Sequence, residues 1–217
     1  MSEMSANAVE ITDLKKVYSA YGKTGKETKA LKEVSLTIPQ EEFFAFLGTN
    51  GDGKSTLISI LAGLTSKSSG TVKVNGISID ENPDEVKKSI GLVPQEFNFS
   101  IFEKVIDIVL DQAGYYGIPR TEALPVAEKL LQDLGLWEKR NEKAQALSGG
   151  MKRRLMIARG LIHQPKIILL DEPTAGVDVE LRRGMWEFLN RVNGEGTTIV
   201  LTTHYLEEAE QLSRHIA

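Results

Sequence analysis

The 217 residues are enough for one domain with a substantial core, and a content of 41% hydrophobic and 26% charged residues excludes a disordered or collagen-like chain. There is no cysteine, which excludes disulfides, thiolate catalysis and cysteine-ligated metals. The formal net charge of −4 argues against wide nucleic-acid binding, and apolar runs such as Ile167–Leu170 are far shorter than the ~20 residues that cross a bilayer.

The N-terminal part of the chain predicts strands followed by a helix. Gly22–Lys29, rich in glycine, lysine and threonine, interrupts the first strands and is predicted as a surface loop. Apolar residues at helical spacing predict a buried helix over Lys54–Ala62, which Gly63 ends. The predicted strands before this helix are Val9–Tyr18, Glu33–Ile38 and Phe43–Leu47.

A hairpin and a helical block are predicted next. Asn75–Gly76 suits the positive φ angles of a type I′ turn, so Thr71–Ile79 is predicted as an antiparallel pair. The pattern between Phe102 and Leu161 is mostly helical, and one of its helices spans Thr121–Leu134 and ends at Gly135. This block is expected to form a helical subdomain.

The C-terminal part predicts a βαβ unit. Lys166–Leu170 and Thr197–Thr202 are apolar or β-branched runs on either side of the helical stretch Glu180–Val192, as a buried pair of parallel strands requires. A short helix is predicted over Leu206–Leu212. The sequence stops at Arg214–Ala217, where another strand is expected to begin, so we expect a shortened C-terminal end.

The segment Gly48–Ser55 matches the pattern G-x-x-x-x-G-K-[ST] between a predicted strand and a predicted helix. Glycines let backbone N–H groups turn inward around anionic oxygens, and the helix N-terminus adds positive potential there. Lys54 is expected to bridge phosphates, and Ser55 to offer its hydroxyl to Mg²⁺. The expected phosphate-binding residues are Gly48, Asn50, Gly51, Gly53, Lys54, Ser55 and Thr56.

Asp52 places a carboxylate within this anion-binding loop. At a separation of ~6 Å and an effective dielectric constant of ~20, each like-charge pair costs roughly 3 kcal/mol. We therefore expect the Asp52 side chain to point outward, away from bound phosphate.

Two carboxylates follow the apolar run Ile167–Leu170, at the end of a predicted parallel strand where ligands of open α/β sheets bind. Asp171 suits a Mg²⁺ site. Because neighbouring strand residues face opposite ways, Glu172 is expected instead to act as the general base on an attacking water. Taken alone, such an acidic pair more often caps the next helix, but the phosphate-binding pattern favours the chemical role.

Leu147–Met151 reads LSGGM and resembles the signature of the ATP-binding cassette (ABC) ATPases. The resemblance covers nearly the whole chain, because the two nucleotide motifs, the glutamine Gln95, the loop ending at Asp178 and the histidine His204 follow in the family's order. Gly91–Phe99 and other stretches resemble in particular the YadG-type bacterial exporter ATPases.

The resemblance implies an α/β fold: a P-loop NTPase (RecA-like) core with an N-terminal antiparallel β subdomain and an inserted α-helical subdomain. Residues 1–217 would form a single ABC ATPase domain. Its nucleotide-binding core would comprise residues 1–98 and 159–217, with the helical signature subdomain at about 99–158. The implied ligands are ATP and Mg²⁺.

The resemblance also implies the roles of further residues. Tyr18 resembles the aromatic residue that stacks on adenine, with Tyr21 as the alternative. Gln95 resembles the residue that joins the Mg²⁺ shell and senses a membrane subunit, and His204 resembles the switch histidine that contacts the γ-phosphate. The expected catalytic residues are then Lys54, Gln95, Glu172 and His204, and the expected metal ligands are Ser55, Gln95 and Asp171.

The LSGG segment implies a second half-site. Ser148 can cap a helix that begins at Gly149, and its hydroxyl with the following N–H groups, including that of Gly150, forms another anion site. In the family two domains pair head to tail, so this segment closes over ATP held by the other copy, and Asp178 links the two sites. A homodimer is therefore expected.

The resemblance implies an exporter ATPase that works with a separate transmembrane permease on the cytoplasmic face of the inner membrane. The alternative is a soluble ABC-type ATPase acting on nucleic acid, the ribosome or iron–sulfur assembly; the acidic charge balance favours the exporter, and no nucleic acid is expected. The basic run Lys152–Arg154 is predicted as a solvated helix face. Thr49 and Asp52 depart from the proline and alanine common in the family's loop.

Overall fold

The computed structural model describes residues 7–19 and 27–217. The strands span Asn7–Tyr18 (β1), Thr28–Pro39 (β2), Phe43–Leu47 (β3), Ser69–Val74 (β4), Ile77–Ser78 (β5), Ile90–Val93 (β6), Ile167–Asp171 (β7), Thr198–Thr203 (β8) and His215–Ile216 (β9). The helices span Lys54–Leu61 (α1), Pro83–Ser89 (α2), Val105–Tyr115 (α3), Arg120–Asp133 (α4), Gly149–Leu161 (α5), Val179–Gly194 (α6) and Leu206–Leu212 (α7). Short 3₁₀ turns lie at Trp137–Lys139 and Ala144–Ala146.

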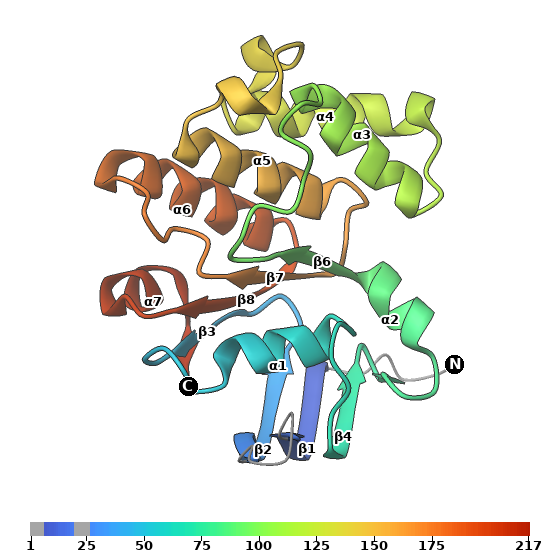
Figure 1. The fold of residues 1–217 in the computed structure, drawn as a ribbon, viewed down its shortest axis with the longest axis vertical. Helices are drawn as coiled ribbons and strands as arrows, with labels where there is room; N and C mark the ends of the chain where they lie inside the picture. Colours follow the sequence, from blue (N-terminus) through green and yellow to red (C-terminus); the bar gives the residue numbers. More distant parts are fainter. Residues whose placement is uncertain (1–6, 20–26) are drawn as a thin grey trace.

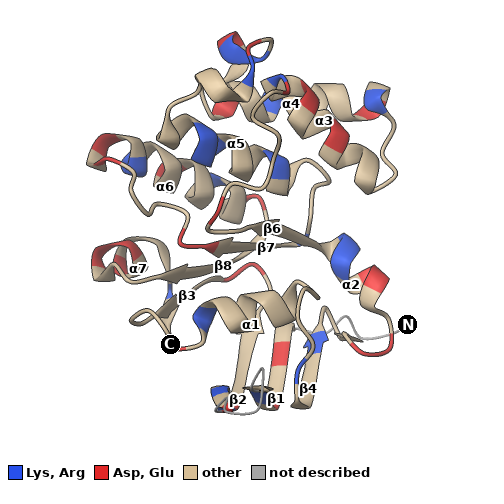
Figure 2. Cartoon of the chain, viewed as in Figure 1, with Lys and Arg blue, Asp and Glu red and all other residues tan. Residues whose placement is uncertain are grey.

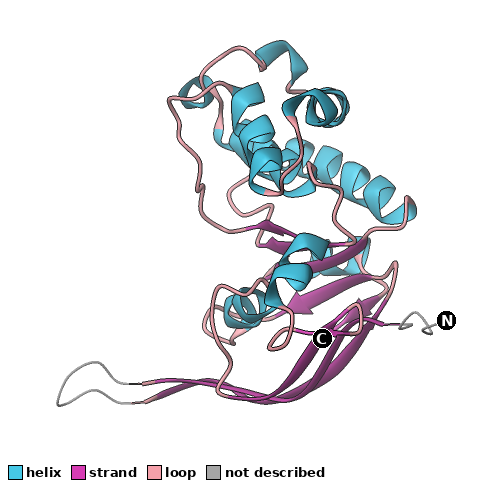
Figure 3. Ribbon diagram, turned by 90° about the vertical axis from the view of Figure 1, so that its right-hand side faces the viewer, coloured by secondary structure: helices cyan, strands magenta, loops and turns pink. Residues whose placement is uncertain are grey.

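The elements form layers around two sheets (Figure 1). An antiparallel sheet has the strand order β2-β1-β4-β5, and a parallel sheet has the order β6-β7-β8-β3-β9. Helix α1 lies between the two sheets, while α5 and α6 cover the opposite face of the parallel sheet, with α3 and α4 above them. In the turned view the antiparallel sheet extends into a long two-stranded arm formed by β1 and β2 (Figure 3).

The parallel sheet separates two hydrophobic cores. On β7, Ile167 and Leu169 belong to the core shared with α1 and the antiparallel sheet, whereas Ile168 and Leu170 belong to the core beneath α3–α6. All four side chains are fully buried. Side chains alternate along a strand, so a strand covered on both faces must be apolar at every position, as this one is.

Most predicted elements are present. Asn75 and Gly76 have φ angles of 50° and 78°, as the predicted hairpin turn requires, and Gly63 with φ of 68° follows the end of α1. The predicted βαβ unit is β7-α6-β8, with β7 and β8 parallel neighbours. At the C-terminal end, β9 pairs with β3.

The structure differs from the sequence prediction in three places. Strand β2 begins at Thr28, five residues before the predicted start at Glu33, so the end of the predicted loop Gly22–Lys29 belongs to a strand. The rest of that loop up to Lys26, with Tyr21, lies outside the described residues. Helix α2 and strand β6 were not predicted.

A glycine pair brings strand β6 close to helix α5. A Cβ atom built on Gly91 would lie 2.2 Å from the carbonyl oxygen of Gly160, and one built on Gly160 would lie 2.9 Å from Cγ2 of Val93. No larger side chain fits at Gly91 without moving the helix. The two backbones are therefore in direct contact, at the strand that leads to Gln95.

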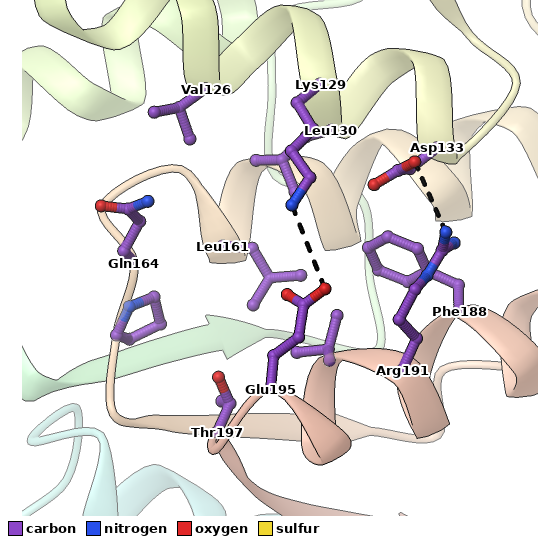
Figure 4. A pocket seen from close by; sticks show the side chains of 12 residues that line it. Val126, Lys129, Leu130, Asp133, Leu161, Gln164, Phe188, Arg191, Glu195 and Thr197 are labelled. Atoms are coloured by element: carbon purple, nitrogen blue, oxygen red, sulfur yellow. Dashed lines mark ion pairs between the residues drawn. The ribbon is translucent and has the colours of Figure 1, made fainter.

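A cavity of about 230 Å³ lies between α4 and α6, where Lys129 faces Glu195 and Arg191 faces Asp133 (Figure 4). The two ion pairs measure 4.0 Å and 3.6 Å between nitrogen and oxygen. None of the residues with a predicted chemical role lines this cavity. Within the described ranges, no helix has the length and hydropathy needed to span a membrane.

Candidate functional site

The predicted phosphate-binding loop connects β3 to the first turn of α1. Gly51 and Gly53 have φ angles of 96° and 91°, which side-chain-bearing residues rarely adopt. A Cβ atom on Gly53 would also lie 2.5 Å from the carbonyl oxygen of Ala30. The ammonium of Lys54 donates to the carbonyl oxygens of Gly48 and Thr49, each at 2.7 Å, so the loop folds back over the start of the helix.

Ser55 and Asp171 meet at the carboxyl end of the parallel sheet. The hydroxyl of Ser55 donates to Oδ1 of Asp171 at 3.2 Å, and the hydroxyl of Thr202 donates to the same oxygen at 2.5 Å. A hydroxyl next to a carboxylate fits the oxygen preference of Mg²⁺. Among the described residues no group of three or more His, Cys, Asp or Glu side chains is arranged to hold a metal ion by itself.

Glu172 lies at the centre of a second cluster, next to Asp171 but with different partners. Its Oε2 atom accepts a hydrogen bond from Nε2 of Gln95 at 3.1 Å and lies 3.4 Å from Nδ1 of His204. The residue is only 7% exposed. The structure therefore brings together three residues that sequence analysis placed at one reaction centre from separate motifs.

The LSGG segment begins helix α5. Ser148 is the N-cap residue, and its hydroxyl accepts a hydrogen bond from the N–H of Met151 at 3.3 Å. Ser148 and Gly149 are exposed, and Gly150 packs near Leu181. An exposed, capped helix start is free to receive an anion from another molecule.

Asp178 and Tyr18, two further predicted site residues, lie at the ends of other elements. Asp178 caps α6, and its Oδ1 accepts a hydrogen bond from the N–H of Leu181 at 2.9 Å. Tyr18 ends β1 with 41% of its surface exposed, and the ammonium of Lys16 lies 4.7 Å from its ring centre. An exposed aromatic ring is available for stacking on a planar base.

The profile of the ABC transporter family matches residues 31–175 of the chain. This chain belongs to the ABC transporter family. The match includes the phosphate loop, the signature segment and the two carboxylates Asp171 and Glu172 at the end of β7, but it ends before Asp178 and His204. The two sheets and the inserted helices are the P-loop NTPase fold of an ABC ATPase cassette.

Relatives with known names are similar over almost the whole chain. The linearmycin resistance ATP-binding protein LnrL of Bacillus subtilis is 36% identical, over 96% of this chain and 65% of that protein. The retinal-specific phospholipid-transporting ATPase ABCA4 of Homo sapiens is 39% identical, over 95% of this chain and 9% of that protein. The chain thus spans about two thirds of the bacterial relative and a small part of the human one.

A solved structure described as the dimeric structure of MJ0796, a bacterial ABC transporter cassette, superposes with a TM-score of 0.84 at 30% sequence identity. The alignment covers 95% of this chain and 92% of that chain. A second structure of MJ0796, a dimeric post-hydrolysis state bound to ADP and Pi, superposes with a TM-score of 0.85.

Arg153 corrects one sequence prediction. The run Lys152–Arg154 was expected to form a solvated helix face, but Arg153 is 6% exposed and donates to the carbonyl oxygens of Pro94 and Gln95 at 3.0 Å and 2.8 Å. Arg154 likewise donates to the carbonyl of Leu134. Arg153 precedes the buried Met156 by three residues, a spacing that places both on one helix face and was visible in the sequence.

The charge of Arg153 also faces the reaction centre. Burial lowers the pKa of its guanidinium below the ordinary value, and the nearby carboxylates of Asp171 and Glu172 oppose that change. Arg153 therefore connects the signature helix to the Gln95 segment, near the two carboxylates.

Asp52 was expected to point outward; the residue is exposed, but its carboxylate turns back onto the loop. Its Oδ2 atom accepts hydrogen bonds from the N–H and the hydroxyl of Thr49, at 2.6 Å and 3.0 Å. The two residues that depart from the family's common loop sequence thus bond to each other. A proline at position 49 would have no N–H to donate.

Asp52→Asn is expected to tighten ATP binding by about three- to tenfold, because the amide keeps an acceptor for Thr49 and removes a negative charge near the phosphates; water screens the exposed site and limits the gain. Titration calorimetry with Mg-ATP at two salt concentrations measures the change, which should shrink in high salt. Asp52→Ala is the companion variant, since it removes both charge and acceptor. A gain below about threefold in both variants would contradict the repulsion.

Proposed function

We propose that this chain is the ATP-binding and ATP-hydrolysing subunit of an ABC exporter. The observation that carries the proposal is the contact of Glu172 with Gln95 and His204 beside the Ser55–Asp171 pair. A buried carboxylate next to a phosphate-binding loop is suited to remove a proton from water, and the adjacent hydroxyl and carboxylate are suited to hold Mg²⁺.

Each residue has a distinct task in this proposal. The N–H groups of the loop Gly48–Gly53 and the start of α1 bind phosphate oxygens, and Lys54 contributes its charge. Ser55, Asp171 and Gln95 hold Mg²⁺, which supplies charge neutralisation on the phosphates when bound. Glu172 orients and deprotonates the attacking water, His204 contacts the γ-phosphate, and Tyr18 stacks on adenine.

The active unit in this proposal is a head-to-tail homodimer. Ser148–Gly150 of one copy face the nucleotide held by the other copy, and Asp178 lies near the contact between copies. The exposed start of α5 supports this arrangement, and so does the dimeric state of the similar MJ0796 cassette. The two half-sites of one chain are then completed by symmetry.

The second partner is a separate transmembrane permease, bound on the cytoplasmic face of the inner membrane. A cavity of about 350 Å³ beside β6 is bordered by the exposed Leu64 and by Arg159. Arg159 also borders an adjoining cavity that is lined by the exposed Tyr115. Exposed apolar side chains around a hollow are typical of a protein interface. Relatives named for linearmycin resistance and Nod factor export support the direction of transport.

The test is to co-express the chain with membrane proteins encoded by neighbouring genes and to purify any complex in detergent. Mg²⁺-dependent phosphate release that rises when the membrane protein is present supports the proposal. Co-purification with RNA or ribosomal proteins, with no binding to the membrane protein, would favour the soluble alternative. Lys and Arg positions are interspersed with Asp and Glu positions along the ribbon in Figure 2.

A further inference from the structure

Glu208 on α7 is a fully buried carboxylate to which none of the roles above refers. Its Oε1 atom accepts hydrogen bonds from the hydroxyl of Thr174 at 2.6 Å and from Nε1 of Trp186 at 3.1 Å. Its Oε2 atom is buried and has no hydrogen-bond partner among the described residues. Burying a carboxyl group with only one oxygen bonded is costly, and an apolar side chain would fill the position at a smaller cost.

The partners of Glu208 connect two segments of the reaction centre. Thr174, also fully buried, follows Glu172 by two residues, in the turn after β7. Helix α7, which carries Glu208, begins two residues after His204. The bond between Thr174 and Glu208 therefore holds the segment of the candidate base against the segment of the candidate switch histidine, whose side chains lie 3.4 Å apart.

The backbone of Glu172 needs such support. Its φ angle is 47°, in the left-handed region, which is strained in a residue other than glycine and persists only where the surrounding structure holds it. On one side, the N–H of Glu172 bonds to the carbonyl and hydroxyl oxygens of Thr202, at 3.1 Å and 3.2 Å. On the other side, residues 172–177 form a turn in which the N–H of Ala175 bonds to the carbonyl of Glu172 and the N–H of Val177 to that of Thr174. The hydroxyl of Thr174 then ties this turn to Glu208 on α7.

We propose that Glu208 is a positioning residue, which fixes Glu172 relative to His204 through its hydrogen bond with Thr174. In this role it acts through these two segments and not by direct contact with the reacting atoms. Trp186 of α6 shares the same oxygen, so the link also includes the helix that Asp178 caps. The inference rests on the proposed ATPase function.

The test compares four single variants in the full chain, Glu208→Ala, Glu208→Gln, Thr174→Val and Thr174→Ser, with the double variant Glu208→Ala/Thr174→Val. Glu208→Ala and Thr174→Val are expected to lower kcat by about 10- to 100-fold with KM within about threefold, because a displaced base slows the chemical step without changing nucleotide binding. The double variant is expected to lose no more than the worse single variant, since both changes break one link. Glu208→Gln and Thr174→Ser, which keep an acceptor and a hydroxyl, are expected to retain most of the turnover.

Tryptophan emission reports the contact itself. The chain has two tryptophans, so in a Trp137→Phe background Trp186 is the single emitter. Its emission is expected to shift in Glu208→Ala, and neither emission nor kcat should change in Glu210→Ala, an exposed position on the same helix. If Glu208→Ala lowers the folded fraction, the kcat of Thr174→Val is used to decide the test.

A fall in melting temperature with kcat per folded molecule unchanged, in Glu208→Ala and in Thr174→Val, would reduce Glu208 to a structural residue and overturn the inference. Additive losses in the double variant would overturn the shared link. Absence of Mg²⁺-dependent turnover in the wild-type chain with its membrane partner would instead overturn the proposed function. The two failures are therefore distinguishable.

Discussion

Glu172→Gln is expected to lower ATP turnover by about 10²–10⁴-fold while ATP-dependent dimerisation persists. The amide has nearly the shape of the carboxylate and can still accept the hydrogen bond that Gln95 donates at 3.1 Å. It has no basic oxygen with which to remove a proton from water, so the loss should fall on the chemical step. Phosphate release at saturating Mg-ATP and light scattering after gel filtration, with and without nucleotide, measure the two properties.

The matched control is Glu85→Gln, which makes the same change at an exposed position on α2. Its turnover and its dimerisation should equal those of the wild type. Unchanged turnover in Glu172→Gln would remove Glu172 from the role of general base. Loss of dimerisation together with turnover would show that the carboxylate is needed for the fold of the site rather than for proton transfer.

Arg153→Met is expected to lower the free energy of unfolding by about 1.5–3 kcal/mol, which is the range for one hydrogen bond to a charged group. Two such bonds are lost, but the variant no longer buries a charge, and that gain offsets part of the loss. The variant leaves the carbonyl oxygens of Pro94 and Gln95 without their donor. The Gln95 side chain then loses its fixed position beside Glu172, so we expect turnover to fall by about tenfold or more. Urea unfolding and phosphate release measure the two effects.

Lys152→Met is the control for this variant, because the neighbouring residue lies on the same turn but is only half-buried. It should change neither stability nor turnover by a measurable amount. Equal effects of the two substitutions would show that the result reflects general damage to α5. A stable Arg153→Met protein with full turnover would contradict the role of Arg153 in holding the Gln95 segment.

Sequence analysis predicted the parts of the fold that depend on short, local patterns. The hairpin at Asn75–Gly76 follows from backbone conformations that these two residue types favour, and β7 follows from an uninterrupted apolar run. The phosphate loop was found for the same reason, because glycine spacing, lysine and serine lie within one segment of Gly48–Ser55. The proximity of Gln95, Glu172 and His204 was expected only through the family resemblance.

The elements that were not predicted had weaker or longer-range signals. Helix α2 is short, although Pro83 at its start and acidic residues in its first turn were available as signals. Strand β6 is a short run with glycine at its second position, and that glycine is explained only by the approach of α5. The burial of Arg153 and Glu208 depends on contacts between distant segments, about which charge patterning along the chain carries little information.

The direct contact of Gly91 with Gly160 has a mechanical consequence. Where a helix packs on a sheet through large side chains, changes of rotamer let the two elements shift against each other. At Gly91 and Gly160 neither residue has a side chain whose rotamer could change. A tilt of α5 is therefore expected to move the strand that runs into Gln95. Strand and helix would then move as one rigid unit, with the candidate catalytic glutamine after the strand and Ser148, the residue of the proposed dimer contact, at the start of the helix.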